Sequence, residues 1–206
     1  MNLFILFLSL VTIQQTSPKE NDNIIPWSQN RKLVWDDFKA SPDGTSSNAA
    51  LTNAKIVFNY GHNGKILKFD VRCGFDKTKS WARIKNDYIL SHEQKHFDIA
   101  EIYARKLYKA LTEYQFKVKT VDKDLNAIYQ KVMQEHFTAQ SEYDSQTDHS
   151  LKLEEQKKWD EKIEQELKEE NDIPKGIVKW YVEILDETEE PLVGLGTILT
   201  MVARKK

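Results

Sequence analysis

The sequence predicts an α+β fold in which a small antiparallel sheet from the first third packs on a helical half. Two β-rich runs are separated by a hairpin turn, and three later segments repeat their apolar residues every three or four positions. Of the 206 residues, 40% are apolar, which is enough for a buried core and excludes a wholly disordered chain. The formal charge of −2 provides no basic field for a phosphate backbone, so we expect no nucleic-acid partner.

The first residues have the pattern of a secretory leader. The apolar run from Leu3 to Ile13 is followed by polar residues, and it is too short for a membrane span, which needs roughly 20 residues. We therefore predict a signal peptide over residues 1–17, a secreted or periplasmic location, and no stable membrane span after cleavage. Pro18–Asn30 is polar and is expected to be a linker. Cys73 is the only cysteine, so no internal disulfide can form.

Strands are expected in the first third of the mature chain. Arg31–Phe38 can form a short strand or a turn of helix, and the turn residues of Ser41–Asn48 predict a loop. Leu51–Tyr60 and Ile66–Cys73 are rich in β-branched and aromatic residues, and Gly61–Gly64 between them is typical of a hairpin turn.

Helices are expected in the middle of the chain. A helix starting near Tyr88 and capped by Asn86 or Asp87 carries one continuous apolar stripe as far as Tyr114. A second helix is predicted over Asp124–Gln140, a polar break over Ser141–Ser150, and a third, heavily charged helix over Leu151–Glu169.

The chain is predicted to end in a hairpin. Ile177–Leu185 and Leu192–Val202 have the composition of two strands around an acidic turn. We therefore expect a main domain over residues 18–172 and a C-terminal β-hairpin appendage over residues 173–206.

The residues His92-Glu93-Gln94-Lys95-His96 form the pattern HExxH within the first predicted helix. Residues four apart share one face of a helix, so both imidazoles can reach one ion, and Zn²⁺ suits such a pair. Glu93 flanks the pair, where a general base for a zinc-activated water belongs. The two histidines also lie in register with the apolar stripe, so we expect them to face the interior.

A catalytic zinc site needs a third protein ligand. Three candidates lie downstream: His149 and Asp144 in the predicted polar break, and His136 on the second helix. Because zinc prefers imidazole, we favour His149. Asp144 then has the alternative role of a residue that orients a ligating imidazole, and His136 that of a core histidine.

Several segments together resemble a bacterial domain-of-unknown-function family described as predicted secreted zinc-dependent proteases. The similarity rests on Leu33–Phe38, Lys79–Trp81, Leu90–Glu101, and a last part with Tyr143, Asp144, Thr147, His149, Gln156 and Trp159. It implies a zincin-like fold, ligand roles for His92 and His96, a catalytic role for Glu93, and a site that includes the Tyr143–His149 segment. Ser150 departs from the family pattern, where a glycine follows the histidine.

The resemblance and the motif together predict a single-zinc metallohydrolase, with a peptide or protein as substrate. Tyr143 is a candidate for donating a hydrogen bond to a developing oxyanion. Two other functions are compatible with the same residues: a non-catalytic envelope module stabilised by a metal, and a zinc amidase acting on cell-envelope amide bonds. A structural site would need no base and would close its fourth position with another protein ligand.

Overall fold

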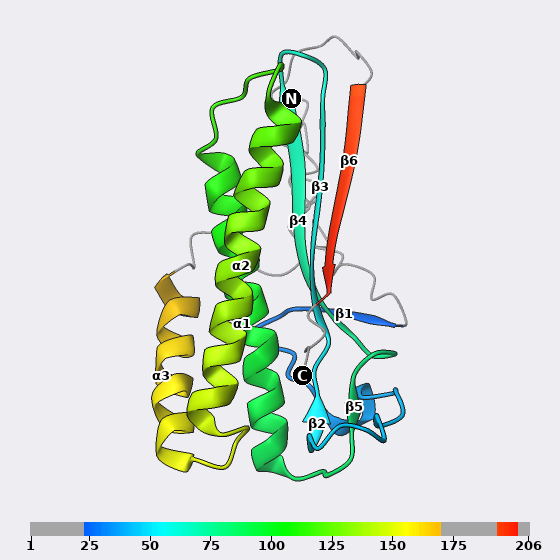
Figure 1. The fold of residues 1–206 in the computed structure, drawn as a ribbon, viewed down its shortest axis with the longest axis vertical. Coiled ribbons are helices and arrows are strands. Elements are labelled where there is room, and N and C mark those ends of the chain that lie inside the picture. Colours follow the sequence, from blue (N-terminus) through cyan, green and yellow to red (C-terminus); the bar gives the residue numbers. More distant parts are fainter. Residues whose placement is uncertain (1–22, 170–192, 202–206) are drawn as a thin grey trace, which may run out of the picture.

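Figure 1 shows a computed structural model of the chain, which describes residues 23–169 and 193–201. The signal peptide expected over residues 1–17 and the strand expected over Ile177–Leu185 lie outside the described residues. Within the described ranges, no helix is long and apolar enough to cross a membrane.

The α+β fold expected from the sequence is confirmed: one layer is an antiparallel sheet and the other is formed by three helices (Figure 1). The main sheet has the strand order β1-β4-β3-β6, and all neighbours are antiparallel. Its strands are β1 (Ile24–Pro26), β3 (Ala54–His62), β4 (Leu67–Asp76) and β6 (Val193–Met201). A second sheet consists of two short strands, β2 (Ala50–Leu51) and β5 (Trp81–Ala82).

The β3–β4 hairpin follows from alternation and from its turn residues. Ala54, Ile56 and Phe58 are buried on one face of β3, and their partners across the pair, which are Phe75, Cys73 and Val71, are buried as well. At the turn, the side chain of Asn63 accepts hydrogen bonds from the backbone of residues 65 and 66, and Gly64 has a φ of 87°. The hairpin expected around Gly61–Gly64 is therefore confirmed.

Three helices lie on one side of the sheet, and α3 is the one farthest from the strands (Figure 1). They are α1 (Asp87–Thr112), α2 (Val121–Thr147) and α3 (Leu153–Glu169). Helix α1 packs on β3 and β4, whereas α2 and α3 pack on α1 and on each other. A 3-10 turn, η1 (Trp35–Asp37), lies where the sequence allowed a strand or a turn of helix.

Two expectations about the extent of elements are wrong. The described part of the segment expected to be a linker, Pro18–Asn30, contains a strand, because Ile24–Pro26 pairs with β4 as strand β1. The polar break expected over Ser141–Ser150 does not exist as such, because α2 continues without interruption to Thr147. This second difference matters for the site, since it places Asp144 on a helix.

The last strand joins the main sheet. β6 pairs with β3 along most of its length, from Lys55↔Met201 to His62↔Val193. The strand expected over Leu192–Val202 is therefore confirmed, and β3 lies between β4 and β6 instead of at the sheet edge.

Candidate metal centre

Helix α1 positions the two histidines of the HExxH pattern. Asn86 caps the helix by accepting a hydrogen bond from the backbone N–H of Ile89 at 2.8 Å, as expected for an N-cap. His92 and His96 follow one turn apart, and both are buried, with 3% and 4% of their surfaces exposed. The expectation that both face the interior is confirmed.

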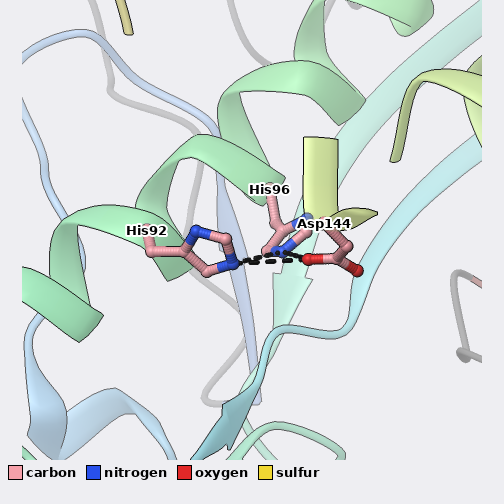
Figure 2. Close-up of side chains that lie close together, drawn as sticks. All are labelled: His92, His96 and Asp144. Atoms are coloured by element: carbon pink, nitrogen blue, oxygen red, sulfur yellow. Dashed lines mark hydrogen bonds and ion pairs between the residues drawn. The ribbon is translucent and has the colours of Figure 1, made fainter. Parts of the chain in front are cut away.

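The third member of the cluster comes from α2. Figure 2 shows the two imidazoles projecting from α1 toward the carboxylate of Asp144. The Nε2 atoms of His92 and His96 lie 3.2 Å apart, and Asp144 Oδ1 lies 3.3 Å from the first and 3.0 Å from the second. Ligand atoms bound to one tetrahedral zinc at 2.0–2.1 Å are separated by about 3.3 Å, so the three atoms have the spacing of a ligand set.

The tautomer of His92 follows from the orientation of Gln156 on α3. The Gln156 amide nitrogen donates to Asp160 Oδ1 at 2.8 Å and to the Tyr143 hydroxyl at 2.6 Å, so its amide oxygen must face the other way. That oxygen lies 2.8 Å from His92 Nδ1, and it can only accept. A neutral His92 therefore carries its proton on Nδ1, and its Nε2 presents a lone pair.

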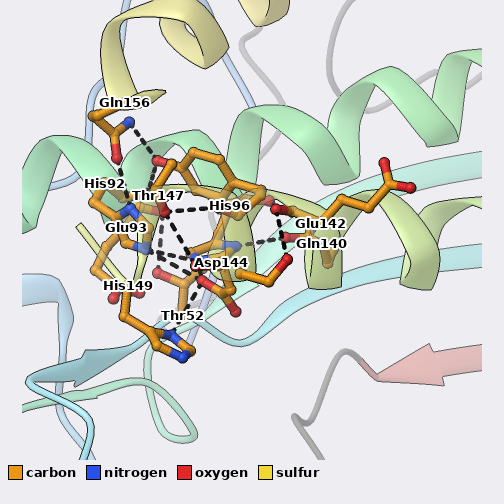
Figure 3. Close-up of polar contacts among 12 residues, drawn as sticks. Thr52, His92, Glu93, His96, Gln140, Glu142, Asp144, Thr147, His149 and Gln156 are labelled. Atoms are coloured by element: carbon orange, nitrogen blue, oxygen red, sulfur yellow. Dashed lines mark hydrogen bonds and ion pairs between the residues drawn. The ribbon is translucent and has the colours of Figure 1, made fainter. Parts of the chain in front are cut away.

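The same reasoning fixes His96. The amide nitrogen of Gln140, on α2, donates to the carbonyl oxygen of His96 at 2.9 Å. The amide oxygen of Gln140 then lies 2.5 Å from His96 Nδ1 and accepts a hydrogen bond from its N–H (Figure 3). Both imidazoles thus have their N–H groups engaged on the far side and direct Nε2 lone pairs into the cluster.

This arrangement places three hydrogen-bond acceptors against one another. With both imidazoles neutral, two Nε2 lone pairs and a carboxylate oxygen repel each other, and burial makes that repulsion stronger. A bound cation, or a proton on one Nε2, removes it. Nδ1–H bonds to an amide oxygen are also the usual means of orienting a metal-bound histidine. The residues present therefore fit a metal ion, and His92, His96 and Asp144 are the group in the described part of the chain that could hold one.

Glu93 lies beside the cluster with a carboxylate oxygen that has no partner. Only 3% of its surface is exposed, and its Oε2 makes no hydrogen bond. Its main-chain carbonyl accepts a hydrogen bond from the Thr52 hydroxyl at 3.1 Å, just after β2, which anchors this turn of α1 to the small sheet. A buried carboxylate oxygen without a partner is costly as a structural element, and it suits a group that receives a proton.

Tyr143 does not have the position expected of an oxyanion donor. Its side chain is fully buried and stacks on the ring of His92, with centroids 4.5 Å apart. Its hydroxyl donates to the carbonyl of His92 at 3.3 Å and accepts from Gln156. Burial raises the pKa of Tyr143 far above its usual range. Tyr143 therefore packs against the imidazole of His92, and its hydroxyl is buried away from solvent.

His149 is not a member of the three-residue group, although the sequence favoured it as third ligand. Its Nδ1 lies 3.6 Å from Asp144 Oδ1, and 54% of its side chain is exposed (Figure 3). The structure instead brings Asp144, the alternative from the sequence, together with His92 and His96. The physical reason is helical register: Gln140 and Asp144 are one turn apart on α2, whereas His149 follows the helix end at Asp148.

His136, the remaining candidate, lies behind the cluster. It is fully buried, and its Nε2 is 3.0 Å from the amide nitrogen of Gln140, which donates to it. Burial is the largest cause that lowers the pKa of His136, to about 3. His136 is therefore a neutral core histidine that holds Gln140. This is the alternative role that the sequence analysis gave to His136.

Sequence reasoning missed two residues that position the site. Gln140 was assigned only as the end of a helix, and Thr52 was not singled out. A signal for Gln140 did exist, because His136, Gln140 and Asp144 are spaced four residues apart and so share one helix face.

A comparison with protein families matches residues 12–150 to the family described as "Bacterial protein of unknown function (DUF922)". The chain belongs to this family. The matched part of this DUF922 member includes His92, Glu93, His96, Asp144 and His149, and it ends before α3, which supplies Gln156. Searches of curated proteins and of solved structures found no match to the DUF922 chain.

Proposed function

We propose that the protein is a zinc-dependent metallopeptidase that hydrolyses peptide or protein substrates. In this proposal His92, His96 and Asp144 hold a single ion, and Glu93 is the general base. The observation that carries it is the convergence of two Nε2 lone pairs and one carboxylate oxygen, with both Nδ1–H groups engaged elsewhere.

The donor set supports zinc as the metal. Imidazole nitrogen and carboxylate oxygen at one buried point suit Zn²⁺, which binds both at about 2.0–2.2 Å. When bound, the ion would act as a Lewis acid toward a carbonyl oxygen and make water more acidic. In the described ranges, the group of candidate ligands has three members. A catalytic zinc site has three protein ligands and one open position, whereas a structural site has four protein ligands.

Glu93 performs the proton transfers. Its unpartnered Oε2 takes a proton from the attacking water, whose oxygen forms a bond to the carbonyl carbon. The same carboxyl then delivers that proton to the nitrogen of the leaving amine as the C–N bond breaks. The proton gained in the first step is the proton lost in the second, so Glu93 ends ionised.

The proposal is tested by zinc analysis and digestion of a peptide library with four proteins. The wild type should bind one equivalent of zinc and cleave peptides. Glu93→Gln should bind zinc normally and lose about 10²–10⁴-fold in rate, the contribution typical of a general base. His92→Ala should lose both zinc and activity. Glu154→Gln, the same change at an exposed position of α3, is the matched control and should behave as the wild type.

Two results would contradict the proposal. Cleavage by Glu93→Gln at the wild-type rate would remove Glu93 as the base. A wild type that binds zinc tightly and cleaves no peptide would indicate the non-catalytic module instead.

A further inference from the structure

His149 has a side chain that is exposed next to a buried cluster. Asp144 is 6% exposed and the two ligating histidines less, yet 54% of the His149 side chain is open to solvent, and its Nδ1 is 3.6 Å from Asp144 Oδ1. His149 therefore lies on the side of the cluster that a substrate can approach (Figure 3).

The backbone under this side chain is held in an unusual conformation. Asp148, His149 and Ser150 have φ values of 51°, 52° and 78°, the left-handed region that residues with a Cβ rarely adopt. The N–H of His149 donates to the carbonyl of Asp144 at 2.9 Å, and the N–H of Lys152 donates to that of Thr147 at 2.9 Å. Such strain persists only where the surrounding structure fixes it, and at functional sites it serves to orient a group in advance.

The other side chains described at the site offer no hydrogen-bond donor to a substrate. The cluster oxygen and the two Nε2 atoms are acceptors, and Glu93 contributes a carboxylate. The N–H groups of both ligating histidines are engaged by Gln156 and Gln140, and the hydroxyl of Tyr143 is buried behind His92. His149 is an imidazole that carries at least one N–H in every protonation state, and it faces the cluster.

We propose that His149 is a further catalytic residue, which donates a hydrogen bond to the carbonyl oxygen of the substrate while that oxygen carries negative charge. This inference rests on the proposed function. It transfers to His149 the role that the sequence suggested for Tyr143, and it explains why an imidazole beside the ligands is not itself in the ligand group. A donor fixed in place before reaction stabilises the charged oxygen more than the neutral carbonyl, so it acts on the rate and little on substrate binding.

The kinetic test compares His149→Ala and His149→Gln with Leu151→Ala, an exposed control in the same loop. His149→Ala should lower kcat by about 10²–10³-fold, as for other oxyanion donors, with KM within a few fold of the wild type. His149→Gln keeps an N–H and should recover part of kcat. Zinc affinity should be unchanged in all three. A tenfold or larger loss of zinc affinity in His149→Ala would make His149 a ligand and overturn the inference, as would an unchanged kcat.

A second measurement does not depend on turnover. Inorganic phosphate is an oxyanion, and its binding to the zinc-loaded protein can be followed by calorimetry. We expect His149→Ala to weaken phosphate binding at least about tenfold, and Glu93→Gln to leave it equal or stronger, because a negative charge is removed. Equal phosphate affinity in wild type and His149→Ala, or no phosphate binding by the wild type, would overturn the role of His149. These outcomes are separate from failure of the peptidase proposal, which concerns cleavage and Glu93.

Discussion

Gln156 offers the sharpest test of the metal centre, because it fixes the tautomer of His92 without contacting the ion. Its amide oxygen accepts from His92 Nδ1 at 2.8 Å, and its amide nitrogen is engaged by Asp160 and Tyr143. Gln156→Leu keeps the volume and removes the acceptor. His92 can then move its proton to Nε2, which is the atom that must be free to bind zinc.

The expected loss can be estimated from similar sites. Removing a group that orients a metal-bound histidine typically costs 10–100-fold in metal affinity, which is about 1.4–2.8 kcal/mol. The stabilisation by saturating zinc should fall by the same amount, because the proposed site exists only in the folded chain. For a chain of this size, the increase in Tm on zinc addition should therefore shrink by about 3–11 °C.

The assay is competition for zinc with a chromophoric chelator, together with thermal unfolding in EDTA and in zinc. Gln165→Leu is the matched control: it makes the same change on the same helix, at an exposed residue whose amide bonds only Glu169 at 2.7 Å. A Gln156→Leu protein with wild-type zinc affinity would refute the assignment of the His92 tautomer, and with it the main support for the ligand set.

Two further outcomes follow from the same structure. Ser150→Gly should raise Tm by about 1–3 °C in differential scanning calorimetry. Relief of the left-handed φ of 78°, worth about 1–2 kcal/mol, exceeds the cost of the backbone entropy that glycine adds to the unfolded chain, about 0.5–1 kcal/mol. Ser150→Ala should give no gain, and a lower Tm for Ser150→Gly would contradict the argument. The zinc-free protein should lose stability in urea titrations as pH falls from about 6.5 toward 3. The pKa of His136 is lowered to about 3 in the folded state, so the unfolded state binds the proton first. His136→Gln should reduce this pH dependence, and an identical slope of the unfolding free energy against pH in both proteins would exclude His136 as its source.

The sequence could predict α1 and its two histidines because their face is mostly apolar. The stripe that includes His92, His96 and Ile99 recurs every three or four residues, and the structure buries all three. The β3–β4 hairpin could be predicted for a similar reason, since its buried residues alternate and its turn contains Asn63 and Gly64.

The end of α2 could not be found in this way. Its inward face continues from His136 through Gln140 and Asp144 to Thr147, and all four are buried although all are polar. A prediction from apolar periodicity cannot detect a buried face made of polar residues. The last turns of α2 therefore have the composition of a loop although they are helical. The choice of His149 as third ligand had the same origin, because residue chemistry was weighed without the helical register that places Asp144 opposite α1.

The polar residues of this face form one connected network, which fixes the three side chains that could hold an ion. His136 holds Gln140, Gln140 orients His96 and bonds its carbonyl, and Asp144 lies one turn further along the same face. On the other side, Gln156 orients His92 and binds the hydroxyl of Tyr143, which packs under the ring of His92.

Each of the two imidazoles is thus fixed by a glutamine side-chain amide whose own direction is set by a second partner. The two glutamines lie on different helices, so α1, α2 and α3 must all dock before both Nε2 atoms point to the same place. Assembly of the candidate metal centre is therefore coupled to packing of the helical layer, which is where the cost of burying so many polar groups is compensated.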